Sequence, residues 1–156
     1  MATVDRFQQL LSDLSREIAG KQLDESLEVF LNRDFPPGGE TFDNIRAACE
    51  AGIAAGWLCD REAGGLRFGR VIKPGPATHG FSVDVVLMRE CVGPHHAHPR
   101  GEIDMIMPVD PGARFDDRPE GWLVYSDTTA HSPTVTGGEA IVLYLLPEGA
   151  IEFTRP

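Results

Sequence analysis

The sequence predicts a mainly β protein, a single antiparallel β-barrel with an N-terminal helical segment. Two observations lead to this class. Up to about residue 56 the apolar residues recur at helical spacing, whereas from Trp57 onward short extended runs alternate with Gly, Pro and Asp. The second pattern is typical of antiparallel barrels and sandwiches. We therefore expect residues 1–56 to form helices packed on a barrel of residues 57–156, in one structural domain with a shared core.

Three helices are expected in the N-terminal segment. Residues 4–18 carry one apolar stripe, and Gly20 suits the end of this first helix. The second helix should begin with Asp24 as its N-cap and stop before the Pro- and Gly-rich stretch 34–39. Thr41 is expected to cap the third helix, whose apolar face includes Ile45 and Cys49.

The rest of the chain should form the strands of the barrel. Each expected strand is a short run rich in β-branched and aromatic residues, bounded by residues that favour turns. The strands are expected at residues 66–72, 81–89, 92–98, 102–107, 121–125, 131–135, 139–146 and 151–153.

Composition and charge narrow the classes of partner. A chain of 156 residues with 42% hydrophobic and 24% charged residues is ordinary for one soluble globular domain. The formal net charge of -10 makes nucleic acids and anionic membranes poor partners, because both are bound through clustered Lys and Arg. The three cysteines include no CxxC pair, which argues against a disulfide framework and a cysteine zinc site. With no secretory signal or apolar span, we expect a cytoplasmic protein that binds a small molecule.

The residues that carry chemistry concentrate in the stretch 93–102, GPHHAHPRGE. Residues two apart on a strand face the same side, so His96 and His98 can present their imidazoles to one point. A turn through residues 99–101 would let Glu102, which opens the returning strand, bring its carboxylate to the same point. These nitrogen and oxygen donors suit one divalent ion of Fe, Mn, Zn, Ni or Co.

A fourth ligand would have to come from elsewhere in the chain. The remaining candidates are His79, His95 and His131. His95 faces away from its two neighbours if the strand is regular. His131 opens an expected strand some thirty residues later, where a barrel would bring a second hairpin beside the first.

The spacing HxHxxxE with a single later His resembles the two motifs of the cupin superfamily, here at residues 93–112 and 121–138. The resemblance implies a cupin-type jelly-roll barrel, one divalent metal ion held by His96, His98, Glu102 and His131, and a homodimer. The second motif departs from the pattern, because residues 126–130 replace the usual Pro-x-Gly before the histidine and no Asn follows at the expected place.

A closer resemblance covers nearly the whole chain. Residues 56–70, the run HHAHPRGEID at 95–104 and residues 143–153 are similar to the 4-hydroxylaminobenzoate lyase family of bacterial nitroaromatic breakdown. The resemblance implies the conversion of 4-hydroxylaminobenzoate and water into 3,4-dihydroxybenzoate and ammonia. Such an enzyme needs proton donors, a positioned water and an anchor for a small aromatic carboxylate.

Several residues suit these tasks. Glu102 and Asp104 lie two apart on one expected strand face, and Asp104 is our candidate for proton transfer or for support of the ligands. Arg67 and Arg70 are candidate carboxylate anchors because a guanidinium can bind a carboxylate through two parallel hydrogen bonds. Three residues apart, they point to opposite faces of an unbroken strand, and Arg70 is preferred because Phe68 shares its face.

Tyr125 and Tyr144 are further possible hydrogen-bond donors to a substrate, whereas residues 116–118 look like a solvated turn.

Two other functions use the same residues. A cupin dioxygenase acting on a small aromatic acid would hold Fe(II) at these ligands and consume oxygen. A non-enzymatic small-molecule-binding cupin would need neither metal turnover nor an acid, and Asp104 beside Glu102 argues weakly against it.

Overall fold

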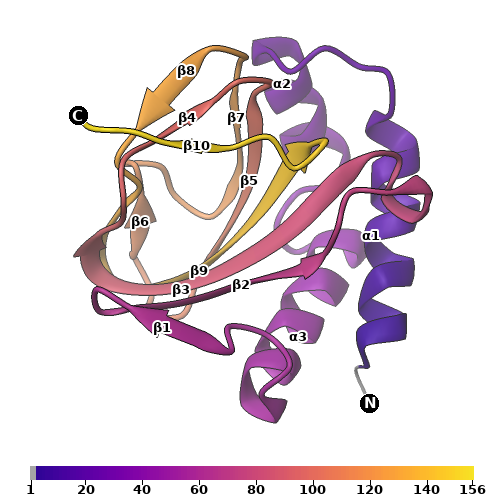
Figure 1. Cartoon of the computed structure of the whole chain (residues 1–156). Coiled ribbons are helices and arrows are strands. Elements are labelled where there is room, and N and C mark those ends of the chain that lie inside the picture. The colour runs from indigo at the N-terminus through magenta and orange to yellow at the C-terminus, as the bar shows by residue number, and fades with distance from the viewer. Residues whose placement is uncertain (1–2) are drawn as a thin grey trace.

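The computed structural model describes residues 3–156, and it confirms the predicted class. Three helices lie together on one side of a large curved antiparallel sheet, and a smaller sheet lies across the open side of the large one (Figure 1). Residues 1 and 2, at the start of the expected helical segment, lie outside the described residues. No helix within residues 3–156 is long and apolar enough to cross a membrane.

The three helices are α1 (Val4–Ile18), α2 (Glu25–Asp34) and α3 (Glu40–Ala55). Asp24 caps α2 as predicted, with its side chain accepting a hydrogen bond from the Leu27 N–H at 3.0 Å. The prediction that Thr41 caps α3 is wrong, because the N-cap is Gly39. No side chain caps the first-turn N–H groups of α3, and the Asp43 carboxylate instead accepts a hydrogen bond at 3.0 Å from the N–H of Gly38, which precedes the N-cap.

The large sheet has the order β1-β2-β3-β9-β5-β7, with β6 paired to β9, and all of its pairings are antiparallel. The small sheet has the order β10-β4-β8. The strands are β1 (Arg61–Ala63), β2 (Leu66–Ile72), β3 (Phe81–Val92), β4 (His96–His98), β5 (Glu102–Pro108), β6 (Arg114–Phe115), β7 (Gly121–Tyr125), β8 (Thr129–His131), β9 (Thr134–Pro147) and β10 (Glu152–Phe153).

Proline explains two differences from the expected strands. The strand expected at 131–135 is divided, because β8 ends at His131 and β9 begins at Thr134. Pro133 lies between them and has no N–H to donate to a ladder. Residues 92–98 were expected to form one strand, but Val92 is the last residue of β3 and β4 begins only at His96. Pro94 lies between the two strands. The unpredicted strands β1 and β6 have only three and two residues, too few to show a period.

Side chains of the central strands alternate between two buried faces. Ile103 and Met105 on β5 belong to the core between the sheet and the helices, together with Leu143 on β9. Ile106 and Val142 belong to a second core inside the barrel. The period of two therefore places Glu102 and Asp104 of β5, and Tyr144 of β9, on the barrel side.

Helix α2 covers the free edge of the large sheet at β7. The Glu28 carboxylate accepts a hydrogen bond from the Val124 N–H at 2.9 Å. The Asn32 amide accepts from the Trp122 N–H at 2.8 Å and donates to the Trp122 carbonyl at 2.9 Å. Side chains of a helix thus pair with backbone groups that would otherwise be left open at a sheet edge.

We expect Asn32→Ala to lower the free energy of unfolding by about 2 kcal/mol, because both backbone groups of Trp122 lose their partner. Urea unfolding followed by circular dichroism measures the change. Val29→Ala is the matched control, since Val29 lies on the same helix with 56% of its surface exposed and should change stability by less than about 0.5 kcal/mol. Equal stability of the two variants would contradict the docking described for α2.

Candidate metal centre

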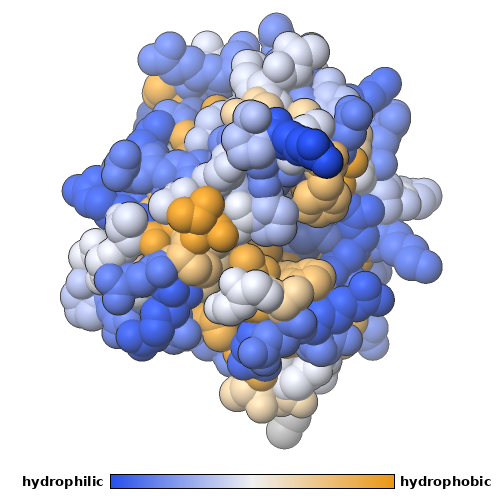
Figure 2. All heavy atoms as spheres, turned by 60° about the vertical axis from the view of Figure 1, so that its left-hand side comes forward, coloured by the Kyte–Doolittle hydropathy of each residue, from blue (hydrophilic) through white to orange (hydrophobic). Residues whose placement is uncertain are grey.

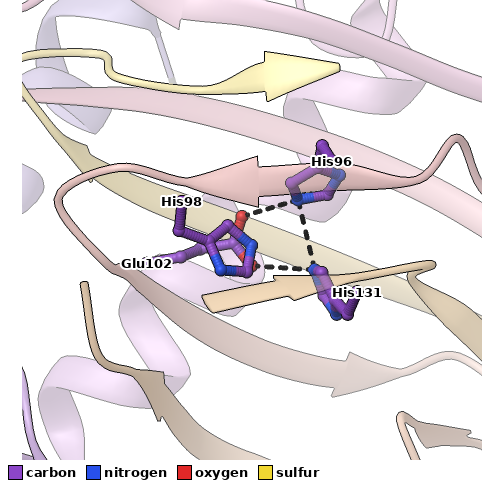
Figure 3. A group of neighbouring side chains, drawn as sticks. All are labelled: His96, His98, Glu102 and His131. Carbon is purple, nitrogen blue, oxygen red and sulfur yellow. Dashed lines mark hydrogen bonds and ion pairs between the residues drawn. The ribbon is translucent and has the colours of Figure 1, made fainter. Parts of the chain in front are cut away.

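Four side chains from three strands converge inside the barrel (Figure 3). His96 and His98 are the two ends of β4, and His131 is the last residue of β8, directly opposite His96 in the antiparallel pair. Glu102 is the first residue of β5. Their potential ligand atoms all lie within 4.8 Å of one another, and Glu102 and His98 are fully buried.

The three imidazoles present the same nitrogen to the Glu102 carboxylate. Glu102 Oε1 lies 3.2 Å from His96 Nε2, and Oε2 lies 3.3 Å from His98 Nε2 and 3.4 Å from His131 Nε2. Burial opposes ionisation of Glu102, but the imidazoles of His131, His96 and His98, each within 3.4 Å of a carboxylate oxygen, hold its pKa well below the usual range. The carboxylate is therefore charged at the centre of the group.

The opposite ring nitrogens fix the orientation of each histidine. His96 Nδ1 lies 3.1 Å from the Pro94 carbonyl, His98 Nδ1 lies 3.0 Å from Thr129 Oγ1, and His131 Nδ1 lies 2.5 Å from Asp116 Oδ2. A carbonyl and a carboxylate only accept hydrogen bonds, so Nδ1 of His96 and His131 donates the proton. Nε2 is then the nitrogen available to a metal ion, which is the arrangement that metal-binding histidines need.

Unpaired atoms at the centre support a bound cation. Within residues 3–156, His98 Nε2 and Glu102 Oε2 are buried without a hydrogen-bond partner. Leaving such atoms unpaired away from water costs free energy, which a divalent ion in contact with both would remove. Three imidazoles and one carboxylate are also an accepted donor set for first-row divalent ions. The four residues therefore fit a metal ion and could hold one.

Asp104 lies next to this group without entering it. It is fully buried, and both of its carboxylate oxygens are unpaired within the described residues. Burial is the main cause that raises the pKa of Asp104 well above its usual range, and the negative charge of Glu102 is the second. Burial therefore favours the neutral, protonated form of Asp104 beside the Glu102 carboxylate.

Asp116 is the site residue that sequence reasoning missed. The sequence predicts a solvated turn at residues 116–118, but the Asp116 side chain is only 12% exposed. It accepts hydrogen bonds from Tyr125 Oη at 2.5 Å, from His131 Nδ1 at 2.5 Å and from the Thr134 N–H at 2.9 Å. Burial would lower the pKa of His131, but the hydrogen bonds to Asp116 and Glu102 raise it to about 9. No local pattern marks Asp116, because its partners lie 9, 15 and 18 residues away.

A cavity of about 730 Å³ opens beside His96. Tyr144 lines it, with its ring centroid 6.4 Å from that of His96, and so do Arg70, Lys73 and Asp84. Most of the wall is apolar, and it includes Leu66, Phe68, Val86, Met88, Ile151 and Phe153. The space-filling view of the barrel side shows apolar surface gathered around a hollow with hydrophilic side chains beyond it (Figure 2).

The four expected substrate-binding residues divide into two pairs. Arg70 and Tyr144 line the cavity, whereas Arg67 and Tyr125 do not. Arg70 already pairs with a carboxylate, because its Nε lies 2.9 Å from Asp84 Oδ1 and its Nη2 lies 3.2 Å from Asp84 Oδ2. The Tyr125 ring instead stacks on His98, with centroids 5.2 Å apart and planes at 28°.

The other two candidate histidines bond elsewhere. His79 Nδ1 lies 2.9 Å from Ser15 Oγ, beside helix α1. His95 Nδ1 lies 2.8 Å from Thr154 Oγ1, after β10. Of the candidates for the fourth ligand, the fold brings His131 to the group.

Comparison with known proteins finds a family model and named relatives that match most of the chain. A family model described as PnbB, 4-hydroxylaminobenzoate lyase, matches residues 9–153. A protein of Nocardioides sp. (strain LMS-CY) named 4-hydroxylaminobenzoate lyase is 31% identical over 153 residues, which cover 92% of this chain and 88% of that protein. A protein of the same name from Pseudomonas putida is 29% identical, with 92% of each chain covered.

Two solved structures are similar to this chain at low identity and low TM-score. An RmlC-like cupin protein from Ralstonia eutropha JMP134 is 15% identical, with a TM-score of 0.44 over 60% of this chain and 62% of that one. The DMSP lyase DddQ from Ruegeria pomeroyi DSS-3 is 19% identical, with a TM-score of 0.41 over 94% of this chain and 77% of that one.

Proposed function

The chain belongs to the 4-hydroxylaminobenzoate lyase family and is a lyase, and we propose that it converts 4-hydroxylaminobenzoate and water into 3,4-dihydroxybenzoate and ammonia. We further propose that one divalent metal ion, held by His96, His98, Glu102 and His131, takes part in the reaction. The observation that carries the proposal is that this buried ligand group meets the wall of an apolar cavity through His96.

The proposed reaction balances without an external oxidant or reductant. The N–O and C–N bonds break, one ring C–H bond breaks, and the ring gains two hydroxyl groups while ammonia leaves. The site must therefore hold the ring, protonate the leaving groups and bind the carboxylate. A bound divalent ion would supply Lewis-acid activation of a hydroxylamine oxygen or of water.

We propose that Tyr144 donates a hydrogen bond to the reacting end of the substrate. Its ring lines the cavity beside His96, so a substrate near the ligand group would also meet the tyrosine. Burial, and then the charges of Glu102 and Asp104, raise the pKa of Tyr144 well above its usual range, so its hydroxyl stays protonated and can donate. Because Asp104 lies outside the cavity lining, we propose that it acts on Glu102 and does not touch the substrate.

We assign the carboxylate anchor to Arg70 and not to Arg67, because Arg70 lines the cavity and Arg67 does not. Asp84 holds the Nε and Nη2 groups of Arg70, so it competes with a substrate carboxylate for the same guanidinium. Arg70 Nη1 takes no part in that pair, and Lys73 also lines the cavity and adds positive charge.

Metal binding is tested first, with protein stripped by a chelator and titrated with Co(II) or Zn(II). We expect about one ion per chain and a raised melting temperature, because an ion that binds only the folded state stabilises it. His96→Ala should weaken binding by at least about tenfold, since it removes a ligand. His95→Ala is the matched control, because that imidazole bonds Thr154. Equal affinity of the two variants would place the ion elsewhere.

Turnover is tested by anaerobic incubation of the metal-loaded protein with 4-hydroxylaminobenzoate. We expect ammonia and 3,4-dihydroxybenzoate in equal amounts without oxygen, lost in His96→Ala and kept in His95→Ala. Product only in air would instead support a dioxygenase that uses the same ligands. No product under either condition would overturn the proposed reaction.

The anchor is tested by two substitutions with opposite expected effects on KM. Arg70→Gln should raise KM for the substrate by about 10- to 100-fold, the loss of a charge-assisted hydrogen bond of about 1.5–3 kcal/mol. Asp84→Asn should lower KM, because it frees the guanidinium from its present partner. Arg67→Gln, on the same strand but outside the cavity, is the control. A rise in KM for both Arg70→Gln and Asp84→Asn would mean that the pair acts structurally.

A further inference from the structure

We propose that Asp116, assisted by Tyr125, is a positioning residue that holds His131 as the fourth ligand of the centre. The inference rests on the proposed metal site and names a residue that a ligand motif does not contain. It concerns the residue that holds the ligand and not the ligand itself.

His131 is the ligand with the least support from its own strand. It is the last residue of β8, which has three residues and pairs only with β4. Two residues later comes Pro133, which cannot donate a backbone hydrogen bond. The His131 side chain is 10% exposed, whereas those of His98 and Glu102 are fully buried. Contacts from another part of the chain must therefore fix its position.

Asp116 supplies these contacts at both ends of the segment 131–134. Its Oδ2 accepts from His131 Nδ1 at 2.5 Å, and its Oδ1 accepts from the Thr134 N–H at 2.9 Å. Its own N–H donates to the Thr134 carbonyl at 2.8 Å. Asp116 has a φ of +49°, a left-handed conformation that Asp tolerates better than most residues. One residue thus joins the end of β8 to the start of β9.

Tyr125 connects this support to a second ligand. Its hydroxyl donates to Asp116 Oδ2 at 2.5 Å, and its ring centroid lies 4.7 Å from that of His131. The same ring stacks on His98. Asp116 and Tyr125 therefore form a hydrogen-bonded pair that contacts two of the three histidines.

The chemistry of the pair requires a carboxylate at position 116. Its side chain accepts three hydrogen bonds, from the phenol, the imidazole and a backbone N–H. An amide of the same shape has a single acceptor oxygen and one NH₂ group that only donates. Asn at this position would place NH₂ against the phenol and imidazole, and His131 would then carry its proton on Nε2. That tautomer takes the lone pair away from the centre.

The test compares Asp116→Asn with Asp117→Asn, an exposed acid in the same turn. The dissociation constant for Co(II) is measured by competition with a chromophoric chelator, and the visible Co(II) spectrum is recorded. We expect Asp116→Asn to weaken binding by about 10- to 100-fold and to change the spectrum, as loss of a group that orients a ligand does. Asp117→Asn should match the wild type.

A double-mutant cycle separates positioning from a general structural effect. In a His131→Ala background, Asp116→Asn should cause no further loss of Co(II) affinity, because the residue acts through the missing imidazole. The same loss in both backgrounds would overturn the inference. Wild-type affinity in Asp116→Asn would overturn it too, and leave the proposed function in place. A wild-type protein that binds no Co(II) would overturn the proposed metal site and the inference together.

Discussion

The alternation of side chains along β5 is the constraint on which the rest of the structure depends. Neighbouring residues of this strand serve two buried regions, with Ile103 and Met105 against the helices and Glu102 and Asp104 inside the barrel. A shift of register by one residue would exchange them and place carboxylates in the apolar core. The helices thus fix the site indirectly, because they accept only the apolar face of the strand.

A charged carboxylate inside the barrel requires compensation that the surrounding strands provide. Glu102 is fully buried, and three imidazoles meet its two oxygens. Burying a charge is costly unless partners of opposite charge or hydrogen-bond donors surround it. Imidazole N–H groups or a bound cation can provide this compensation, and the Nδ1 contacts of His96 and His131 turn Nε2 inward, where it could meet a metal ion.

Local patterns were sufficient to predict much of this arrangement. The helical spacing of apolar residues and the capping residues predicted the three helices, although the predicted cap of α3 was wrong. The motif HxHxxxE predicted three of the four side chains that cluster in the barrel. Neither the partners of Asp116 nor the pairing of Arg70 with Asp84 could be predicted, because both depend on which strands lie side by side. The sequence showed that Arg67 and Arg70 are charged, but it could not show that only Arg70 of the two lines the cavity.

The cover that α2 gives to β7 also limits how molecules of this protein can associate. An open strand edge is a template on which another chain can pair, and such pairing is a route to aggregation. Glu28 and Asn32 occupy the outer hydrogen-bonding groups of β7, so strand addition is blocked at that end of the large sheet. The other end is β1, which offers only three residues. The protein can therefore keep a wide antiparallel sheet whose two end strands offer little edge on which a fibril could grow.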